Sequence, residues 1–139
     1  MINNRTLYAI EALVELASCK DYSSTAEEIS NAKSIPGKFL PQILSNLSNH
    51  GLVRSTRGYG GGVQLAVAPE DISLLHIIEC MQNNLFFYDY LVEQSVVPDG
   101  VGELTLQAFG KTQDAMKDEL SKVTLKTLAG KTKGKGKRK

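Results

Sequence analysis

The cysteines and histidines of this 139-residue sequence, which could ligate a metal or act in nucleophilic catalysis, number four: Cys19, His50, His76 and Cys80. Cys80 and His76 are four residues apart, so on a helix they could share one face and bind a metal together. Cys80 lies in an apolar helical segment, however, where a free cysteine is usually buried and inert. We interpret Cys80 as a structural cysteine, and His50 as the C-terminal residue of a helix.

The remaining thiol and the glycine-rich segment give no evidence for an enzyme. Cys19 follows a predicted helix and could be redox-reactive, although only Lys20 is near enough in sequence to lower its pKa. Residues 58–62 lack the Lys-Ser/Thr and the helix that follow a phosphate-binding loop. The two histidines are far apart and form no evident nucleophile–base pair. We expect a non-enzymatic protein with free thiols, in a reducing compartment.

Residues 51–65 read as two short strands around a glycine-rich tip. The tip holds four glycines, which can adopt positive φ at no steric cost and allow a tight reversal: Gly58, Gly60, Gly61 and Gly62. Arg54 and Arg57 precede the tip, and Tyr59 lies within it. Because a helix-rich segment precedes this hairpin, we interpret it as the wing of a winged helix-turn-helix.

Apolar periodicity predicts a mainly α-helical chain with this one small β-hairpin. We expect helices over about residues 5–19, 25–32, 36–49, 74–82, 102–122 and 125–129, and the hairpin over 52–67. Thr25 and Glu28 fit a capping box, Ser73 and Thr124 can cap the helices that follow them, and Gly51 can end the third helix. Pro36 suits a first turn, whereas Pro41 would kink that helix or distort its start.

Charge is unevenly distributed along the chain. Residues 131–139 hold six of the 16 basic residues, which leaves residues 1–130 with ten basic and 15 acidic residues, a net charge of −5. Residues 29–69 contain no acid but carry Lys33, Lys38, Arg54 and Arg57. Such a segment could face phosphates, or it could be an ordinary solvated surface. We expect a disordered basic tail, which either adds DNA affinity or only improves solubility.

An apolar pattern in the C-terminal half of the sequence predicts an interface between helices. Phe109, Met116 and Val123 repeat every seven residues, with Leu106 and Leu120 beside them, and such a narrow seam usually contacts a second helix, here plausibly of a second subunit. Four of the nine aromatic residues lie just before this helix: Phe86, Phe87, Tyr88 and Tyr90. They could pack internally, or they could form a site for a small-molecule or protein effector.

The motifs together resemble a known family. They are Thr25-Ala-Glu-Glu-Ile, Ile35-Pro-Gly-Lys-Phe-Leu-Pro-Gln-Ile-Leu, the wing from Gly51 to Gly62, and Leu120-Ser-Lys-Val-Thr-Leu-Lys-Thr-Leu. This pattern is similar to that of the IscR/NsrR/CymR family of bacterial winged-helix transcription regulators (the Rrf-two family). The resemblance is strongest over residues 1–82, weaker over 104–129, and absent in the tail.

The resemblance implies a homodimer that binds a near-palindromic operator in double-stranded DNA. By position, the DNA-binding residues would be Pro36, Gly37, Lys38, Phe39 and Gln42 in the third helix, and Arg57, Tyr59 and Gly60 in the wing. We add Thr25, because a helix N-terminus can bind phosphate, although Glu27 and Glu28 oppose tight anion binding there. The family often has a carboxylate at the position of Pro41, which proline cannot replace in base discrimination.

A second departure concerns the signal. Several members of the family hold an iron–sulfur cluster on three cysteines in the loop before the long helix, but residues 83–103 contain no cysteine. We therefore expect no cofactor. The expected organisation is a DNA-binding domain over 1–82, a loop over 83–101, a dimerisation helix and short terminal helix over 102–130, and the tail over 131–139.

Two functions remain open from the sequence. The first is a homodimeric, sequence-specific transcription regulator, expected to be a repressor. The second is a winged-helix module that has lost DNA recognition and docks on a partner protein, which the acidic body and Pro41 favour. Because no run of about 18 apolar residues and no apolar leader occurs, we expect a cytoplasmic protein without membrane contact.

Overall fold

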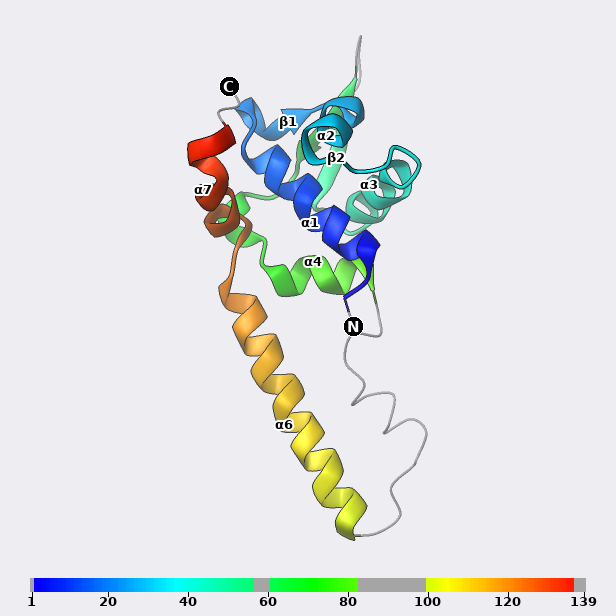
Figure 1. Ribbon diagram of the computed structural model, residues 1–139, viewed down its shortest axis with the longest axis vertical. Coiled ribbons are helices and arrows are strands. Elements are labelled where there is room, and N and C mark those ends of the chain that lie inside the picture. Colours follow the sequence, from blue (N-terminus) through cyan, green and yellow to red (C-terminus); the bar gives the residue numbers. More distant parts are fainter. Residues whose placement is uncertain (1, 57–60, 83–99, 137–139) are drawn as a thin grey trace.

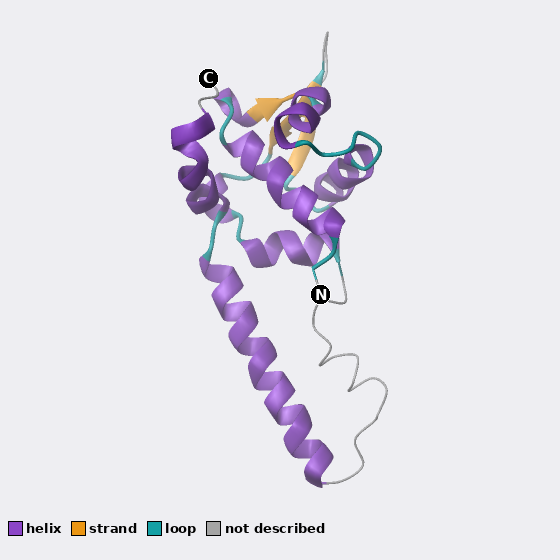
Figure 2. Ribbon diagram, in the orientation of Figure 1, coloured by secondary structure: helices purple, strands orange, loops and turns teal. Residues whose placement is uncertain are grey.

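A body of short helices and a small sheet carries one long helix that projects away from it (Figures 1 and 2). The computed structural model describes residues 2–56, 61–82 and 100–136. The helices are α1 (Asn4–Ala17), α2 (Ala26–Lys33), α3 (Leu40–Asn49), α4 (Leu74–Met81), α6 (Gly100–Lys122) and α7 (Leu125–Gly136), with 3-10 turns η1 (Lys20–Tyr22) and η2 (Pro69–Asp71). The strands are β1 (Ser23–Ser24), β2 (Val53–Thr56) and β3 (Gly62–Leu65). The predicted fold class is confirmed.

The core forms where α1 packs against α2, α3, α4 and the sheet. Its largest completely enclosed side chains come from helices whose apolar residues recur every three or four positions, as predicted. They include Leu13, Leu16, Ile29, Ile43 and Leu47. The periodic apolar faces therefore determine how the helices of the body assemble.

The predicted helix ends are confirmed at the atomic level. The Thr25 hydroxyl accepts a hydrogen bond from the Glu28 amide at 3.1 Å, and the Glu28 carboxylate accepts one from the Thr25 amide at 3.2 Å, which completes the capping box of α2. The Ser73 hydroxyl caps α4 through the His76 amide at 3.1 Å. Gly51 adopts φ +80° directly after α3, a conformation that glycine tolerates and that ends the helix.

The prediction that the third helix starts at residue 36 is wrong. The chain makes a turn in which the Phe39 amide donates to the Pro36 carbonyl at 3.0 Å, and α3 begins only at Leu40. Pro41 is then the second residue of the helix rather than an interior one. The first four N–H groups of a helix have no partner within it, so the missing N–H of Pro41 costs nothing there. Of the two alternatives for Pro41, the altered helix start is correct.

The hairpin gains a third strand that the sequence did not predict. β2 and β3 pair antiparallel, with Val53 opposite Leu65, and β1 pairs with the other edge of β3, with Ser23 opposite Gln64. A strand of two serines has no apolar alternation by which it could be recognised. β1 nevertheless joins the base of the wing to the start of α2.

The last helix is longer than predicted. We expected it to end at residue 129 and the chain to be disordered from 131, but α7 continues to Gly136. This segment contains no proline, and lysine is a good helix former, so a basic composition does not by itself end a helix. The predicted end of this helix at residue 129 is therefore wrong.

Two contacts between backbone segments fix the junction of α6 and α7 to the body. The Leu74 amide donates to the Val123 carbonyl at 2.9 Å, and the Leu125 amide donates to the Ile72 carbonyl at 2.8 Å. Ser73 and Thr124 form the bridge between these segments. Leu125 is completely buried in the same core as α1, so the chain returns to the body after the projecting helix.

Two groups of predicted site residues lie outside the described residues. They are the wing residues Arg57, Tyr59 and Gly60, and the aromatic residues Phe86, Phe87, Tyr88 and Tyr90. Within the described ranges, no helix has the length and apolar character needed to cross a membrane.

Gly62 provides a test of the wing base. A Cβ at this position would overlap the backbone carbonyl of Ser24, because β1 and β3 approach each other closely there. Gly62→Ala should therefore lower the free energy of unfolding by about 1–3 kcal/mol, measured by urea denaturation. Gly37→Ala is the control, since no described atom lies within 4 Å of its Cβ position, and it should change stability by less than about 1 kcal/mol. Equal effects of the two substitutions would contradict the close approach.

Candidate nucleic-acid interface

The turn before α3 and the first residues of that helix form an exposed surface without acidic side chains. Pro36, Gly37, Lys38 and Gln42 are exposed, and Phe39 is half-buried. These are the five residues predicted for the third helix, and the turn brings them together at one end of α3. The segment can present a lysine, an amide and backbone groups to a partner, which is the donor and acceptor set suited to phosphates and base edges.

Aromatic stacking holds this turn against α1. The rings of Tyr8 and Phe39 stack with their centroids 5.7 Å apart and their planes 25° from parallel. The Lys38 ammonium lies 5.2 Å from the centre of the Phe39 ring, within cation–π distance. Sequence reasoning did not find this role of Tyr8, because the two aromatic residues are 31 positions apart in a single sequence. The stack fixes the backbone position of the neighbouring Lys38, while the Lys38 side chain stays exposed.

A groove of about 510 Å³ separates α3 from the strands of the wing. Among the described residues, its walls contain no charged side chain and several small polar ones, including Ser45, Ser48, Asn49, Ser55 and Thr56. Pro41 also lines it, so this proline faces the groove and not the core. The groove extends the uncharged polar surface from α3 to the wing.

Fewer cations of the acid-free segment are available than the sequence implied. The Lys33 ammonium lies 3.3 Å from the Glu11 carboxylate, and its side chain is only 19% exposed. The Arg54 guanidinium donates from Nε to the Gln64 amide oxygen at 3.2 Å, and Gln64 in turn donates to the Asp21 carbonyl at 3.0 Å. These contacts orient Lys33 and Arg54 within the fold, so Lys38 is the cation that the described part of this segment presents most freely.

Thr25 has a structural task that limits what else it can do. Its hydroxyl and its amide are both used in the capping box of α2, and Glu27 and Glu28 occupy the first turn of that helix. The negative side chains offset the positive end of the helix dipole. Thr25 lies at the base of the wing, and its own polar groups are already paired.

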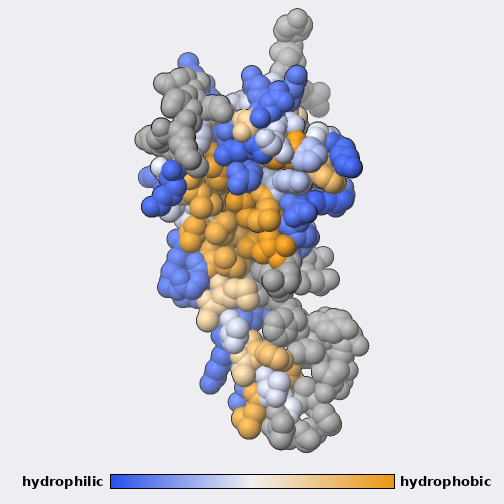
Figure 3. All heavy atoms as spheres, in the orientation of Figure 1, coloured by the Kyte–Doolittle hydropathy of each residue, from blue (hydrophilic) through white to orange (hydrophobic). Residues whose placement is uncertain are grey.

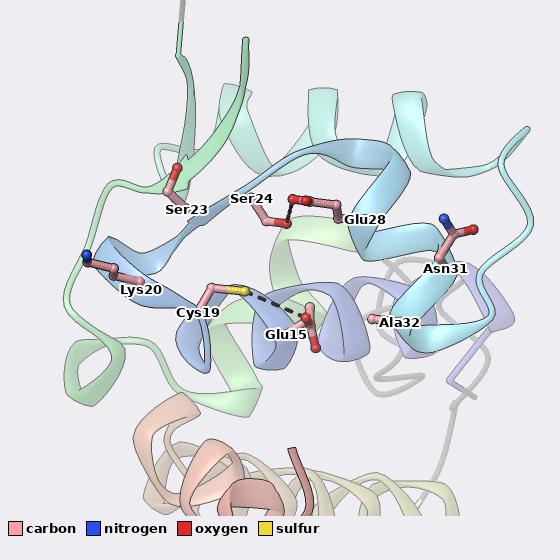
Figure 4. A pocket seen from close by; sticks show the side chains of 8 residues that line it. All are labelled: Glu15, Cys19, Lys20, Ser23, Ser24, Glu28, Asn31 and Ala32. Carbon is pink, nitrogen blue, oxygen red and sulfur yellow. Dashed lines mark hydrogen bonds between the residues drawn. The ribbon is translucent and has the colours of Figure 1, made fainter. Parts of the chain in front are cut away.

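A separate polar cavity of about 470 Å³ lies between the end of α1, β1 and α2 (Figure 4). Cys19 Sγ points toward Glu15, with its sulfur 3.6 Å from the Glu15 carboxylate, and Glu28 accepts from the Ser24 hydroxyl at 2.9 Å. Lys20, Ser23 and Asn31 complete its polar lining. The sequence did not reveal this cavity, because its walls come from four elements, α1, η1, β1 and α2. With two carboxylates, it is not suited to an anion.

The cysteines and histidines lie in different environments, and those of Cys80 and His50 agree with the predictions. Cys80 belongs to the buried core cluster, which confirms its structural role, whereas His76 is exposed. His50 caps the end of α3, with its Nδ1 2.9 Å from the Asn46 carbonyl, as predicted. Burial, and secondarily the charge of Glu79, raise the pKa of the Cys80 thiol. Over the described ranges, no three His, Cys, Asp or Glu side chains are grouped to hold a metal.

Comparison with known proteins decides the family. The model of the Rrf2 family, described as an iron-dependent transcriptional regulator, matches residues 2–131. The chain belongs to the Rrf2 family. An HTH-type transcriptional regulator of Synechocystis sp. is 33% identical over 129 residues, which cover 91% of this chain and 86% of that protein.

Solved structures agree with this assignment. Oxidised CymR of Staphylococcus aureus has a TM-score of 0.72 and 28% identity, over 93% of this chain and 95% of that one. IscR of T. potens has a TM-score of 0.75 over 100% of this chain and 93% of that one, and at 21% identity it supports the fold alone. This Rrf2-family member is thus a winged-helix transcription regulator, and its relatives are regulators rather than enzymes.

The iron of the family description does not fit the donors of this chain. Protein iron–sulfur clusters are held by several cysteine thiolates, in some cases with histidine. The sequence has two cysteines and two histidines, and none of the four lies beyond residue 80. Cys80 is in the apolar core with its pKa raised, so it is a poor thiolate donor. Residues 83–103 contain neither cysteine nor histidine.

The two thiols should differ in reactivity. At neutral pH, iodoacetamide should alkylate Cys19, which is partly exposed, well before Cys80, because Cys80 is buried and its raised pKa keeps it protonated. Timed alkylation followed by peptide mass spectrometry measures both sites in one sample. Unfolding in guanidinium chloride is the control and should make the two rates similar. Fast labelling of Cys80 in the folded protein would contradict its place in the core.

Proposed function

We propose that this Rrf2-family protein is a homodimeric, sequence-specific DNA-binding repressor that works without an iron–sulfur cluster. The turn before α3 and the start of that helix would enter the major groove with Pro36, Gly37, Lys38, Phe39 and Gln42. The wing would reach the minor groove with Arg57, Tyr59 and Gly60. Thr25 would contribute through the position of α2 at the base of the wing.

The observation that carries this proposal is the exposed, acid-free surface around Lys38. Its reading residues are held on a turn that stacks on α1, so they are ordered before any partner binds. Preordered groups lose less conformational entropy on binding than mobile ones do. An uncharged polar groove separates this surface from the wing, and none of its described lining residues is a carboxylate that would repel a phosphate backbone.

A second copy of the chain is supported by apolar surface outside the core. Figure 3 shows apolar side chains gathered over the region of α1 and α4, beside the root of the projecting helix. Leu7 is 49% exposed, and Ile10, Leu74 and Met81 are only partly buried. An exposed apolar patch of this kind marks an interaction site. A dimer would also match a near-palindromic operator, since protein and operator would share a two-fold axis.

The signal would not be iron. With no cysteine between residues 81 and 139, we propose an effector of another kind, a small molecule or protein bound near Phe86, Phe87, Tyr88 and Tyr90. Protein purified without oxygen should then be colourless, with no visible absorbance of a cluster. A brown protein whose colour disappears when iron is removed would overturn this part of the proposal alone.

Docking on a partner protein is the second candidate, and one observation favours it. The Lys33–Glu11 ion pair removes a cation from the surface that would face phosphates, within a body that is acidic overall. A module of this kind would show no measurable DNA affinity, and its interactions would not depend on Lys38 or Arg57.

Salt dependence tests DNA binding itself. On a fragment of its own promoter, affinity should fall steeply as salt rises, because cations bound to phosphates are released on complex formation. Gel shifts at two salt concentrations measure this, with random DNA of equal length as the control. Specific binding should be at least about 1,000-fold tighter than binding to the control. Equal affinity for both fragments at each salt concentration would refute the proposal of sequence-specific binding.

Two substitutions test the individual side chains of the interface. Arg57→Ala should weaken operator binding by about 1–3 kcal/mol if the guanidinium enters a groove. Lys38→Ala should also weaken binding, and it should reduce the salt slope by about one if the ammonium neutralises a single phosphate. Lys111→Ala is the matched control, because Lys111 is exposed on α6, away from the predicted interface. If Arg57→Ala and Lys38→Ala both bind the operator as tightly as the Lys111→Ala control does, the assigned surface is wrong.

A further inference from the structure

Arg54 lies on the face of the wing sheet that is turned away from α3. On β2 it stands between Val53 and Ser55, which both line the groove beside α3. Because successive side chains of a strand point to opposite faces of the sheet, Arg54 points away from that groove, onto what we call the outer face. Gln64 is its direct cross-strand neighbour and shares this face. Neither residue is among the predicted DNA contacts.

Gln64 holds the Arg54 guanidinium by one atom only. Arg54 Nε donates to the side-chain oxygen of Gln64 at 3.2 Å. Gln64 is neutral, and among the described residues no carboxylate forms an ion pair with Arg54. The contact therefore fixes the direction of the guanidinium without cancelling its charge. Four of the five N–H groups of an arginine are on its two terminal nitrogens, so the exposed Arg54 can still donate these four to a partner.

The orientation of Gln64 is itself fixed by a strained turn. Gln64 Nε2 donates to the Asp21 carbonyl at 3.0 Å, so the amide oxygen is the atom that faces Arg54. Rotating the amide by half a turn would place its NH₂ group against the Arg54 N–H and would break both bonds. Asp21 and Tyr22 have φ 58° and 53°, values that residues other than glycine rarely adopt. Backbone of this kind persists where neighbouring contacts hold it, often at functional sites.

From this arrangement we infer that Gln64 is a positioning residue, which aims the Arg54 guanidinium at an operator phosphate on the outer side of the wing. Gln64 acts through Arg54 and does not itself need to contact DNA. The inference rests on the proposed DNA binding and goes beyond it, because it adds a phosphate contact on a face of the sheet that none of the predicted contacts uses.

The proposed position of the wing in a minor groove supplies that phosphate. With α3 in the major groove and the wing in the adjacent minor groove, the strand that separates the two grooves would run between α3 and the wing. The minor groove is only about 6 Å wide, so its second phosphate strand would lie close to the outer face. An arginine fork matches two oxygens of one phosphate. Residues 29–69 contain no acid that would compete for Arg54 or repel this strand.

Gel shifts on the promoter fragment test the contact itself. Arg54→Ala should weaken binding about tenfold and reduce the salt slope by about one, because one phosphate is no longer neutralised. Lys111→Ala controls for the loss of a positive charge elsewhere and should change neither quantity. Unchanged affinity and salt slope in Arg54→Ala would overturn the inference, and that is the result expected if the outer face binds an acidic protein instead of DNA.

A double-mutant cycle separates positioning from a merely structural role. Gln64→Leu removes both hydrogen bonds of the amide and should weaken binding about three- to tenfold, because the guanidinium is no longer held in one direction. In the Arg54→Ala background the same substitution should have no further effect. Gln64→Glu places a carboxylate against Arg54, so it should lower the salt slope as Arg54→Ala does. Circular dichroism checks that each variant folds. An equal loss from Gln64→Leu in both backgrounds would refute the positioning role.

Comparison of promoter and random DNA distinguishes this inference from the proposed function. A phosphate contact carries no sequence information, so Arg54→Ala should weaken binding to both fragments by the same factor. A wild type that does not prefer its promoter, but loses affinity for both fragments in Arg54→Ala, would refute the sequence-specific function and support the contact. A wild type that prefers its promoter, with Arg54 and Gln64 variants that bind equally well, would refute only this inference.

Discussion

The structure depends on a pair of backbone hydrogen bonds that bring residues 72–74 and 123–125 together. Without them, no backbone contact would hold the end of α6 beside the start of α4, although 23 residues of α6 precede that point. With them, Leu125 enters the core and α7 packs against α1. Residues of the same two segments also cap helices: Ser73 caps α4, and the Thr124 hydroxyl accepts from the Thr127 amide at 3.3 Å. Local capping and long-range assembly are thus produced by the same few residues.

What could be predicted from the sequence was mostly local. The Thr25–Glu28 capping box, the Ser73 cap and the Gly51 stop rest on interactions within a few residues, and the apolar periodicity identified the core faces of the helices. The start of α3 was missed because Pro36 and Pro41 compete for the same first turn, and only tertiary packing decides between them. The Tyr8–Phe39 stack, the Lys33–Glu11 ion pair and strand β1 join positions far apart in the chain, and nothing within one sequence reports them. The candidate reading residues were found by resemblance, not by physics, and their mutual arrangement required the structure.

Among the described residues, the proposed recognition surface is built more from neutral polar groups than from charge. Lys33 and Arg54 have partners within the fold, and the described residues that line the groove beside α3 carry no ionised side chain. Coulomb attraction can bring a protein to DNA, but it distinguishes sequences poorly. A surface with few free cations beside serine, asparagine and glutamine side chains would therefore attract DNA of any sequence weakly. Its hydrogen-bonding groups could still distinguish one base sequence from another. In the interior, Cys80 is buried in the core and serves as a small apolar side chain.

The junction between the C-terminal end of α6 and the body also has a mechanical consequence. A helix of 23 residues is about 35 Å long at 1.5 Å per residue. A rotation of only about 5° at its C-terminal end beside Ser73 would displace the other end by about 3 Å over that length. In a dimer joined through this helix, the separation of the two recognition surfaces would follow the same geometry. A small change in packing near residues 72–74 would then change the distance between the two proposed recognition surfaces. The half-sites of an operator are separated by a fixed number of base pairs, so such a change would alter how well the dimer fits both half-sites at once.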